Sequence, residues 1–256
     1  MCGNDAPRVA LFATCVVNAL RPRAAEAACA LLRRAGCVVE VPEQGCCGQP
    51  AFNAGHEAEA RMMAQALLRA LKPYDAVVSP SASCAGMVRN HLPSLFAAGT
   101  ADRAAAEALA ARTFELCAFL RHNDVTPLAK TWRGGPVLWH DSCASLREVA
   151  GAAEAALALL QRVPGLEVIL PDEETRQTCC GFGGLFSAKV PEVSAALAKR
   201  KLGAMLRTAS DASPQVPLII TGVDMGCLTH LAATAEAAGV PTRVMHVAEI
   251  LAGHDI

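Results

Sequence analysis

Several common signals of function are missing from this 256-residue sequence. It has no tract of five or more basic residues and a formal net charge of −1, so it lacks the positive surface that nucleic acid or an anionic membrane would require. No apolar stretch reaches the roughly 18–20 residues that cross a bilayer. The first residues carry no positive start and no apolar run, unlike a secretory signal. These absences predict a cytoplasmic protein with no membrane span and no nucleic-acid partner.

Nucleotide-binding and hydrolase motifs are absent as well. The segment Gly181-Phe182-Gly183-Gly184 is not the G-x-G-x-x-G fingerprint of a dinucleotide site, and no phosphate loop, H-E-x-x-H or G-x-S-x-G is present. A flavin or a nicotinamide usually carries hydride chemistry. Because no site for either is recognisable, the sequence does not favour a self-sufficient dehydrogenase.

Cysteine, by contrast, is abundant, with 12 residues in a chain that is 53% hydrophobic. Structural disulfides are uncommon in a reducing cytosol, so clustered cysteines there indicate metal or redox chemistry.

Short apolar segments alternate with longer amphipathic ones, and the whole order occurs twice. Strand–helix alternation is typical of a parallel sheet flanked by helices. The pattern therefore predicts an α/β fold of two tandem pseudo-symmetric halves, residues 1–130 and 131–256, each a small parallel sheet flanked by helices. Predicted strands are 9–13, 37–41, 76–79, 137–140, 166–170 and 217–220, and predicted helices are 23–35, 57–71, 146–161 and 191–206.

The cysteines repeat in register with this pattern. Each half has one cysteine six residues after the start of its first strand, then a Cys-Cys-Gly motif, then a cysteine after its third strand. The first set is Cys15, Cys46, Cys47 and Cys84; the second is Cys143, Cys179, Cys180 and Cys227. The carboxyl ends of parallel strands share one edge of a sheet, so four sequence-distant thiols can meet there.

These residues suit a metal centre. Adjacent cysteines do not readily bridge each other, but they can point at different atoms of a multi-iron cluster, and the glycine that follows them relieves crowding. Iron–sulfur clusters and zinc both accept four thiolates, although the C-x-x-C knuckles typical of zinc ribbons are absent. Three cysteines outside the repeat, Cys29, Cys37 and Cys117, are interpreted as small buried apolar residues, and Cys2 as a thiol of the chain terminus. His140, beside Cys143, is a candidate donor to a cluster sulfur.

The motifs resemble those of the CCG (cysteine-rich) domain family, which includes the B subunit of heterodisulfide reductase and iron–sulfur subunits of glycolate and glycerol-3-phosphate dehydrogenases. The resemblance spans nearly the whole chain, from Val9 to Leu251, and rests on Gly45-Cys46-Cys47-Gly48-Gln49-Pro50-Ala51, Ser79-Pro80-Ser81-Ala82-Ser83-Cys84, Thr178-Cys179-Cys180-Gly181-Phe182-Gly183-Gly184 and Met245-His246-Val247-Ala248-Glu249-Ile250-Leu251. It is strongest with the branch that takes part in L-lactate oxidation. That implies an oxidoreductase component, an electron-transfer subunit with one 4Fe–4S cluster per half, which acts with a ferredoxin-type iron–sulfur subunit and a third companion to convert lactate to pyruvate.

The sequence departs from the heterodisulfide branch at one position of each half. That branch ends with C-x-x-C, whereas Ser81 and Asp224 stand at the first of those positions here. Four thiols per site favour an ordinary 4Fe–4S cluster over a five-cysteine one, with Asp224 as a weak candidate ligand or tuning group. Two alternatives stay open at this point: a zinc-stabilised scaffold, and a heterodisulfide-reductase-like subunit that carries out thiol–disulfide chemistry.

Overall fold

The protein is built on two parallel sheets, one in each half. A computed structural model describes residues 6–212 and 218–254. The first sheet has the strand order β2-β1-β3-β4 and the second β6-β5-β7-β8, and every neighbouring pair is parallel. The strands are β1 (Arg8–Leu11), β2 (Val38–Glu40), β3 (Ala76–Ser79), β4 (Thr113–Glu115), β5 (Val137–Trp139), β6 (Val168–Ile169), β7 (Leu218–Gly222) and β8 (Thr242–His246). The equivalent orders confirm the predicted α/β fold with an internal repeat.

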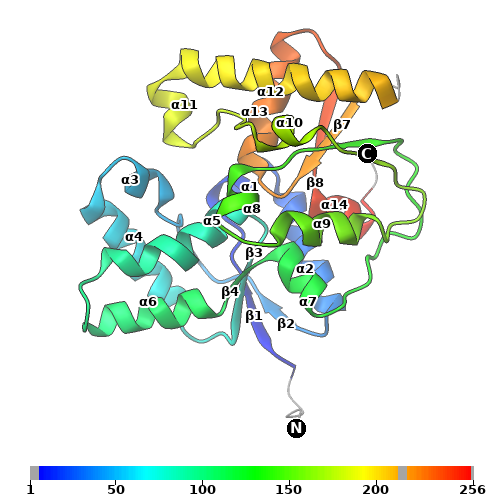
Figure 1. Cartoon of the computed structure of the whole chain (residues 1–256). Helices are drawn as coiled ribbons and strands as arrows, with labels where there is room; N and C mark the ends of the chain where they lie inside the picture. Colours follow the sequence, from blue (N-terminus) through cyan, green and yellow to red (C-terminus); the bar gives the residue numbers. More distant parts are fainter. Residues whose placement is uncertain (1–5, 213–217, 255–256) are drawn as a thin grey trace.

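Helices connect the strands in both halves (Figure 1). Those of the first half are α1 (Cys15–Leu20), α2 (Pro22–Arg34), α3 (Gln49–Asn53), α4 (Glu57–Leu71), α5 (Ala82–Gly86), the π-helix η1 (Met87–His91), the 3-10 helix η2 (Leu92–Leu95), α6 (Ala101–Ala111) and α7 (Leu116–His122). Those of the second half are α8 (Cys143–Arg147), α9 (Ala152–Leu160), α10 (Glu173–Gln177), α11 (Leu185–Lys189), α12 (Pro191–Ala212), α13 (Met225–Ala237) and α14 (Val247–Ala252). Within residues 6–212 and 218–254, no helix combines the length and the apolar character needed to cross a membrane.

The predicted helix over 146–161 is wrong in one respect, because the structure divides it. Helix α8 ends at Arg147, and α9 begins at Ala152 after Gly151, which has a φ of +81°. That left-handed backbone favours glycine and ends a right-handed helix. The break leaves α8 as a short helix whose first residue is Cys143.

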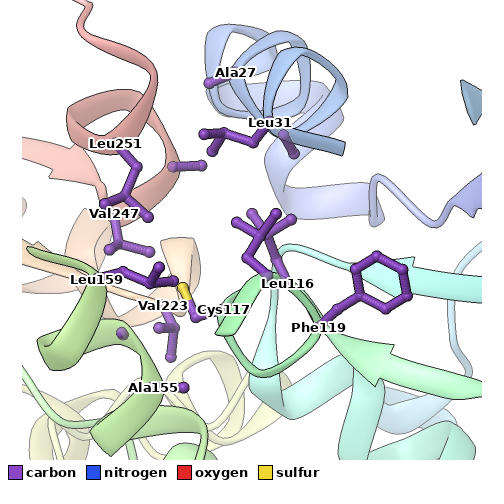
Figure 2. Packing of buried hydrophobic residues seen from close by; sticks show 14 of the residues in the cluster. Ala27, Leu31, Leu116, Cys117, Phe119, Ala155, Leu159, Val223, Val247 and Leu251 are labelled. Carbon is purple, nitrogen blue, oxygen red and sulfur yellow. The ribbon is translucent and has the colours of Figure 1, made fainter. Parts of the chain in front are cut away.

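The two halves share a hydrophobic cluster at their contact. Helix α2 of the first half packs against α14 of the second, and α7 of the first half packs against α9 of the second. Since α2 and α9 each follow the first strand of their half, and α7 and α14 the last, the two contacts are related by the repeat. Figure 2 shows the side chains that meet there, including Leu31, Leu116, Leu159, Val247 and Leu251. This arrangement fixes the carboxyl ends of both sheets relative to each other.

Candidate metal centre

The thiols of Cys15, Cys46, Cys47 and Cys84 meet at the carboxyl end of the first sheet. Cys15 is the first residue of α1, the Cys46-Cys47 pair precedes α3, and Cys84 lies in α5, just after β3. The Sγ atoms of Cys15 and Cys46 are 3.8 Å apart. The thiol of Cys47 contacts those of both Cys46 and Cys84. The structure therefore brings together the four cysteines of the first predicted set.

The second half repeats the arrangement with Cys143, Cys179, Cys180 and Cys227. Cys143 begins α8, and Cys227 lies near the start of α13, after β7. The thiol of Cys179 contacts those of Cys143 and Cys180, and the thiol of Cys180 contacts that of Cys227. Both sets thus form the same chain of thiols in the same sequence order.

Each set contains one thiol whose pKa is lowered by its neighbours. Hydrogen bonds from Cys15 and then Cys47 lower the pKa of the Cys46 thiol, and the backbone N–H of Gly48 adds a further donor at 3.5 Å. Hydrogen bonds with Cys143 and then Cys180 lower the pKa of Cys179, which also accepts from the N–H of Gly181 at 3.3 Å. The corresponding bonds raise the pKa values of Cys15 and Cys143. The pKa values of Cys47 and Cys180 are raised as well, so each set has one thiol that favours the thiolate, the form that binds metals.

The glycine of each Cys-Cys-Gly motif adopts a left-handed backbone. Gly48 has a φ of +85° and Gly181 a φ of +84°. A Cβ at Gly181 would overlap the backbone oxygen of Ser194 in α12, whereas the nearest atoms to a Cβ at Gly48 lie at an ordinary 3.5 Å. The glycine is therefore needed for its backbone conformation in both halves and for close packing in the second.

The buried carboxylate of Asp224 bridges the two halves beside the thiols. It accepts hydrogen bonds from the hydroxyl groups of Ser81, at 2.7 Å, Ser83, at 2.9 Å, and Ser142, and from the N–H of Ser83 at 3.1 Å. Ser83 and Ser142 precede Cys84 and Cys143, so one carboxylate reaches the ligand segments of both sets. These four bonds give Asp224 a defined structural role; its role as a weak ligand stays a prediction.

One cavity of about 470 Å³ lies between the two sets of thiols. The whole first set borders it, and so do Cys143 and Cys227 of the second set. Arg147, from α8, also lines the cavity. Since both sets face the same space, a molecule that enters it comes close to both.

His140 lies beside the second set and has no hydrogen-bond partner for either ring nitrogen in the described part of the chain. Its ligand nitrogen and the sulfurs of Cys180 and Cys227 all lie within 4.8 Å of one another, so this group can hold a metal ion. Burial, followed by the nearby charge of Lys201, lowers the pKa of His140 to about 3. An unpartnered buried imidazole is costly in free energy. That cost, together with the adjoining thiols of Cys180 and Cys227, fits a site whose further partner is an inorganic centre.

The remaining cysteines of the described residues are separate from both sets. Cys37 and Cys117 are buried and Cys29 is half-buried, all as part of the core or packed against it. Cys2 lies outside the described residues. The features that sequence reasoning missed are the Asp224 bridge and the buried Lys201. Lys201 stands at a helix position that is apolar in the first half, whereas Asp224 corresponds to the polar Ser81.

This doubled arrangement of thiols around a shared cavity defines a class of protein. The model of the "Cysteine-rich domain" (CCG) family matches residues 9–89 and again 137–232, and the chain belongs to this family.

Similar proteins carry a common name. The chain is 38% identical to lactate utilization protein A of Geobacillus kaustophilus (strain HTA426), over 95% of this chain and 98% of that protein. It is 36% identical to lactate utilization protein A of Anoxybacillus flavithermus and of an Exiguobacterium species, again over at least 95% of this chain.

Proposed function

We propose that this protein is an iron–sulfur electron-transfer subunit of a cytoplasmic system that oxidises L-lactate to pyruvate. The observation that carries the proposal is the meeting of four thiols at equivalent places in both halves, around one cavity. Cys15, Cys46, Cys47 and Cys84 would hold one 4Fe–4S cluster, and Cys143, Cys179, Cys180 and Cys227 another. Such clusters take up and release single electrons.

The lactate role is supported by relatives that share the name lactate utilization protein A over nearly their whole length. Lactate oxidation removes two electrons and two protons, and a flavin or nicotinamide usually carries that step. The role proposed for this chain is therefore that of an oxidoreductase component, which works with a ferredoxin-type iron–sulfur subunit and a third companion.

A direct test follows electrons from lactate. The anaerobically purified chain is mixed with its partner subunits, L-lactate is added, and the visible absorbance of the clusters is recorded. Bleaching that needs both L-lactate and the partners is the expected result. Clusters that stay oxidised under those conditions, although dithionite reduces them, would contradict the lactate role while leaving the clusters in place.

Zinc is the second candidate, and the group of His140, Cys180 and Cys227 supports it. Zinc accepts mixed cysteine and histidine ligands in tetrahedral geometry, so the chain would be a zinc-stabilised scaffold for redox partners. Zinc is silent in electron paramagnetic resonance at every potential, whereas a reduced 4Fe–4S cluster is not. Reduction of the purified protein followed by that spectroscopy separates the two candidates.

A further inference from the structure

The surroundings of the two thiol sets differ, although their thiols are arranged alike. Position 12 in the first half corresponds to position 140 in the second, because the N–H of each donates to the third strand of its own sheet, to Val78 and Thr221 respectively. Phe12 stands at the first position and His140 at the second. Both side chains are buried, with exposures of 0% and 1%. An apolar ring beside one set is thus replaced by an imidazole beside the other.

A second difference lies on the helix that follows each Cys-Cys-Gly motif. Gly48 packs against Ala60 of α4, and Gly181 packs against Ser194 of α12, which aligns the two helices. Seven residues further along stand Leu67 in α4 and Lys201 in α12.

Lys201 is almost completely buried, with an exposure of 1%. Its Nζ donates to the carbonyl oxygens of Thr175 and Arg176. Burial lowers the pKa of Lys201, while the nearby Asp141 and then the thiols of Cys180, Cys227 and Cys179 favour its charged form. In the first half, Leu67 and Phe12 belong to the same apolar cluster as Cys47 and Cys84. At these two positions the second set therefore has a buried amine and an unpartnered imidazole, and the first set has two hydrocarbon side chains.

We propose that His140 donates a hydrogen bond to a sulfur of the second centre and, with Lys201, raises the reduction potential of that centre above the potential of the first. The proposal rests on the proposed function, since it needs two clusters. Reduction adds negative charge to a cluster, and hydrogen bonds or positive charge nearby stabilise the reduced form. At the two corresponding positions of the first half, the hydrocarbon side chains of Phe12 and Leu67 provide neither effect. One electron shared between the halves then resides on the second centre.

The test replaces each polar residue by its counterpart from the first half. His140→Phe and Lys201→Leu are prepared as full-length proteins, and the potentials of both centres are measured by redox titration followed by electron paramagnetic resonance. Variants Cys47→Ala and Cys180→Ala assign each signal to a half. The wild type should show a higher potential for the second centre. Each substitution should lower that potential toward the first, which itself stays unchanged.

Two further variants act as controls. His140→Gln keeps an N–H donor and should retain more of the higher potential than His140→Phe. Phe12→Leu exchanges one apolar side chain for another and should leave both potentials as they are. Equal potentials in the wild type, or an unchanged potential in His140→Phe with full iron content, would overturn the proposal and leave the proposed function intact. A protein without iron would instead refute the proposed function.

If His140→Phe loses its second centre, the hydrogen bond from His140 can still be tested in the wild type. Histidine is labelled with ¹⁵N, and pulsed electron paramagnetic resonance records nitrogen couplings of the reduced second centre. A weak histidine coupling, lost in His140→Gln, is expected. No histidine coupling, or the strong coupling of a direct iron–nitrogen bond, would contradict the hydrogen bond.

Discussion

The second site tolerates a side chain at Gly181 less well than the first site tolerates one at Gly48. Its φ is +84°, and a Cβ there would overlap the backbone oxygen of Ser194. Because neither a left-handed backbone nor a clash with main-chain atoms can be relieved by rotating a side chain, Gly181→Ala should displace Cys179 and Cys180. We expect the variant to lose about half of its iron, measured as iron per chain after anaerobic purification.

Two glycines serve as controls for this prediction. Gly48→Ala meets only ordinary contacts at 3.5 Å, and Gly239→Ala, with a φ of +69°, meets nothing within 4 Å. Both share the left-handed backbone, so they measure its cost alone, on the order of 1 kcal/mol. Full iron retention in Gly181→Ala would show that the packing against α12 does not position the second centre.

Glu115 should make stability depend on pH. It is completely buried at the end of β4, and burial raises its pKa from 4.5 to about 7. The folded state therefore holds the proton more tightly than the unfolded state, so the stabilisation is complete below pH 4.5 and is lost as the pH rises through about 7. The urea midpoint of unfolding should fall between about pH 5 and 8, and Glu115→Gln should remove most of that fall.

An exposed carboxyl provides the comparison for Glu115. Glu236 lies on the solvent side of α13, and Glu236→Gln should leave the dependence on pH in place. If the urea midpoint of Glu115→Gln fell with pH as steeply as that of the wild type, the carboxyl of Glu115 would not be the source of the pH dependence.

Among single residues, the sequence singled out the eight cysteines, His140 and Asp224, but not Lys201 or the contacts that these polar side chains make. The repeat marked all eight thiols because equivalent positions in two copies identify each other. The burial of Lys201 and the unpartnered ring of His140 depend on how α12 packs over the second sheet, which no local pattern encodes. The bond between Ser81 and Asp224 joins residues 143 positions apart, so only the folded chain reveals it.

At the scale of helices and strands, Asp224 joins three ligand-bearing elements. It is the N-cap residue of α13, while Ser81 and Ser142 cap α5 and α8 and donate to its carboxylate. Asp224→Asn removes the charge and puts an amide where two oxygens accept, so at least one buried donor loses its partner. We expect a loss of about 1–3 kcal/mol in the free energy of unfolding, measured by urea denaturation.

Ser81→Ala is the matched comparison, because it removes one donor and leaves the carboxylate three others. Its effect should be smaller than that of Asp224→Asn. Equal stability of Asp224→Asn and the wild type would mean that the bridge does not hold the three helices together.

The sequence predicted some elements closely and missed others, among them the helices α6 and α13 and the strands β4 and β8. Helix α4 has the predicted bounds, Glu57–Leu71, because its charged and apolar faces alternate over four turns. Strand β4 has only three residues between two helices, and β8 alternates too weakly in burial to stand out. Both edge strands were missed for this reason. Residues 116–120 and 247–251 are equivalent in the two halves, since α7 and α14 each follow the last strand of their sheet.

At the scale of the whole molecule, the shared core should make the halves unfold together. Leu116 of α7 is fully buried at the contact with the second half (Figure 2). Leu116→Ala leaves a cavity there, so we expect a loss of about 2–5 kcal/mol in a single unfolding transition, followed by calorimetry. Leu20→Ala, at a side chain with 58% exposure, should cost little. Two separate transitions, of which Leu116→Ala shifts only one, would contradict the shared core.

The repeat in the sequence indicated two halves but not how the halves pack against each other. The pattern of a strand or helix shows which of its faces is apolar but not which other element covers that face. The packing of α2 on α14 joins apolar faces more than 200 residues apart, and the packing of α7 on α9 crosses the boundary between the halves. The single cavity between the thiol sets is a consequence of that packing.

The central claim is that each half gathers its four thiols around an iron–sulfur cluster. Metal and acid-labile sulfide analysis of the full chain, purified without oxygen, tests it most directly. We expect about eight irons and about eight sulfides per chain, with loss of about half of each in Cys47→Ala and in Cys180→Ala. Stoichiometric zinc without sulfide, from the same preparation, would contradict it.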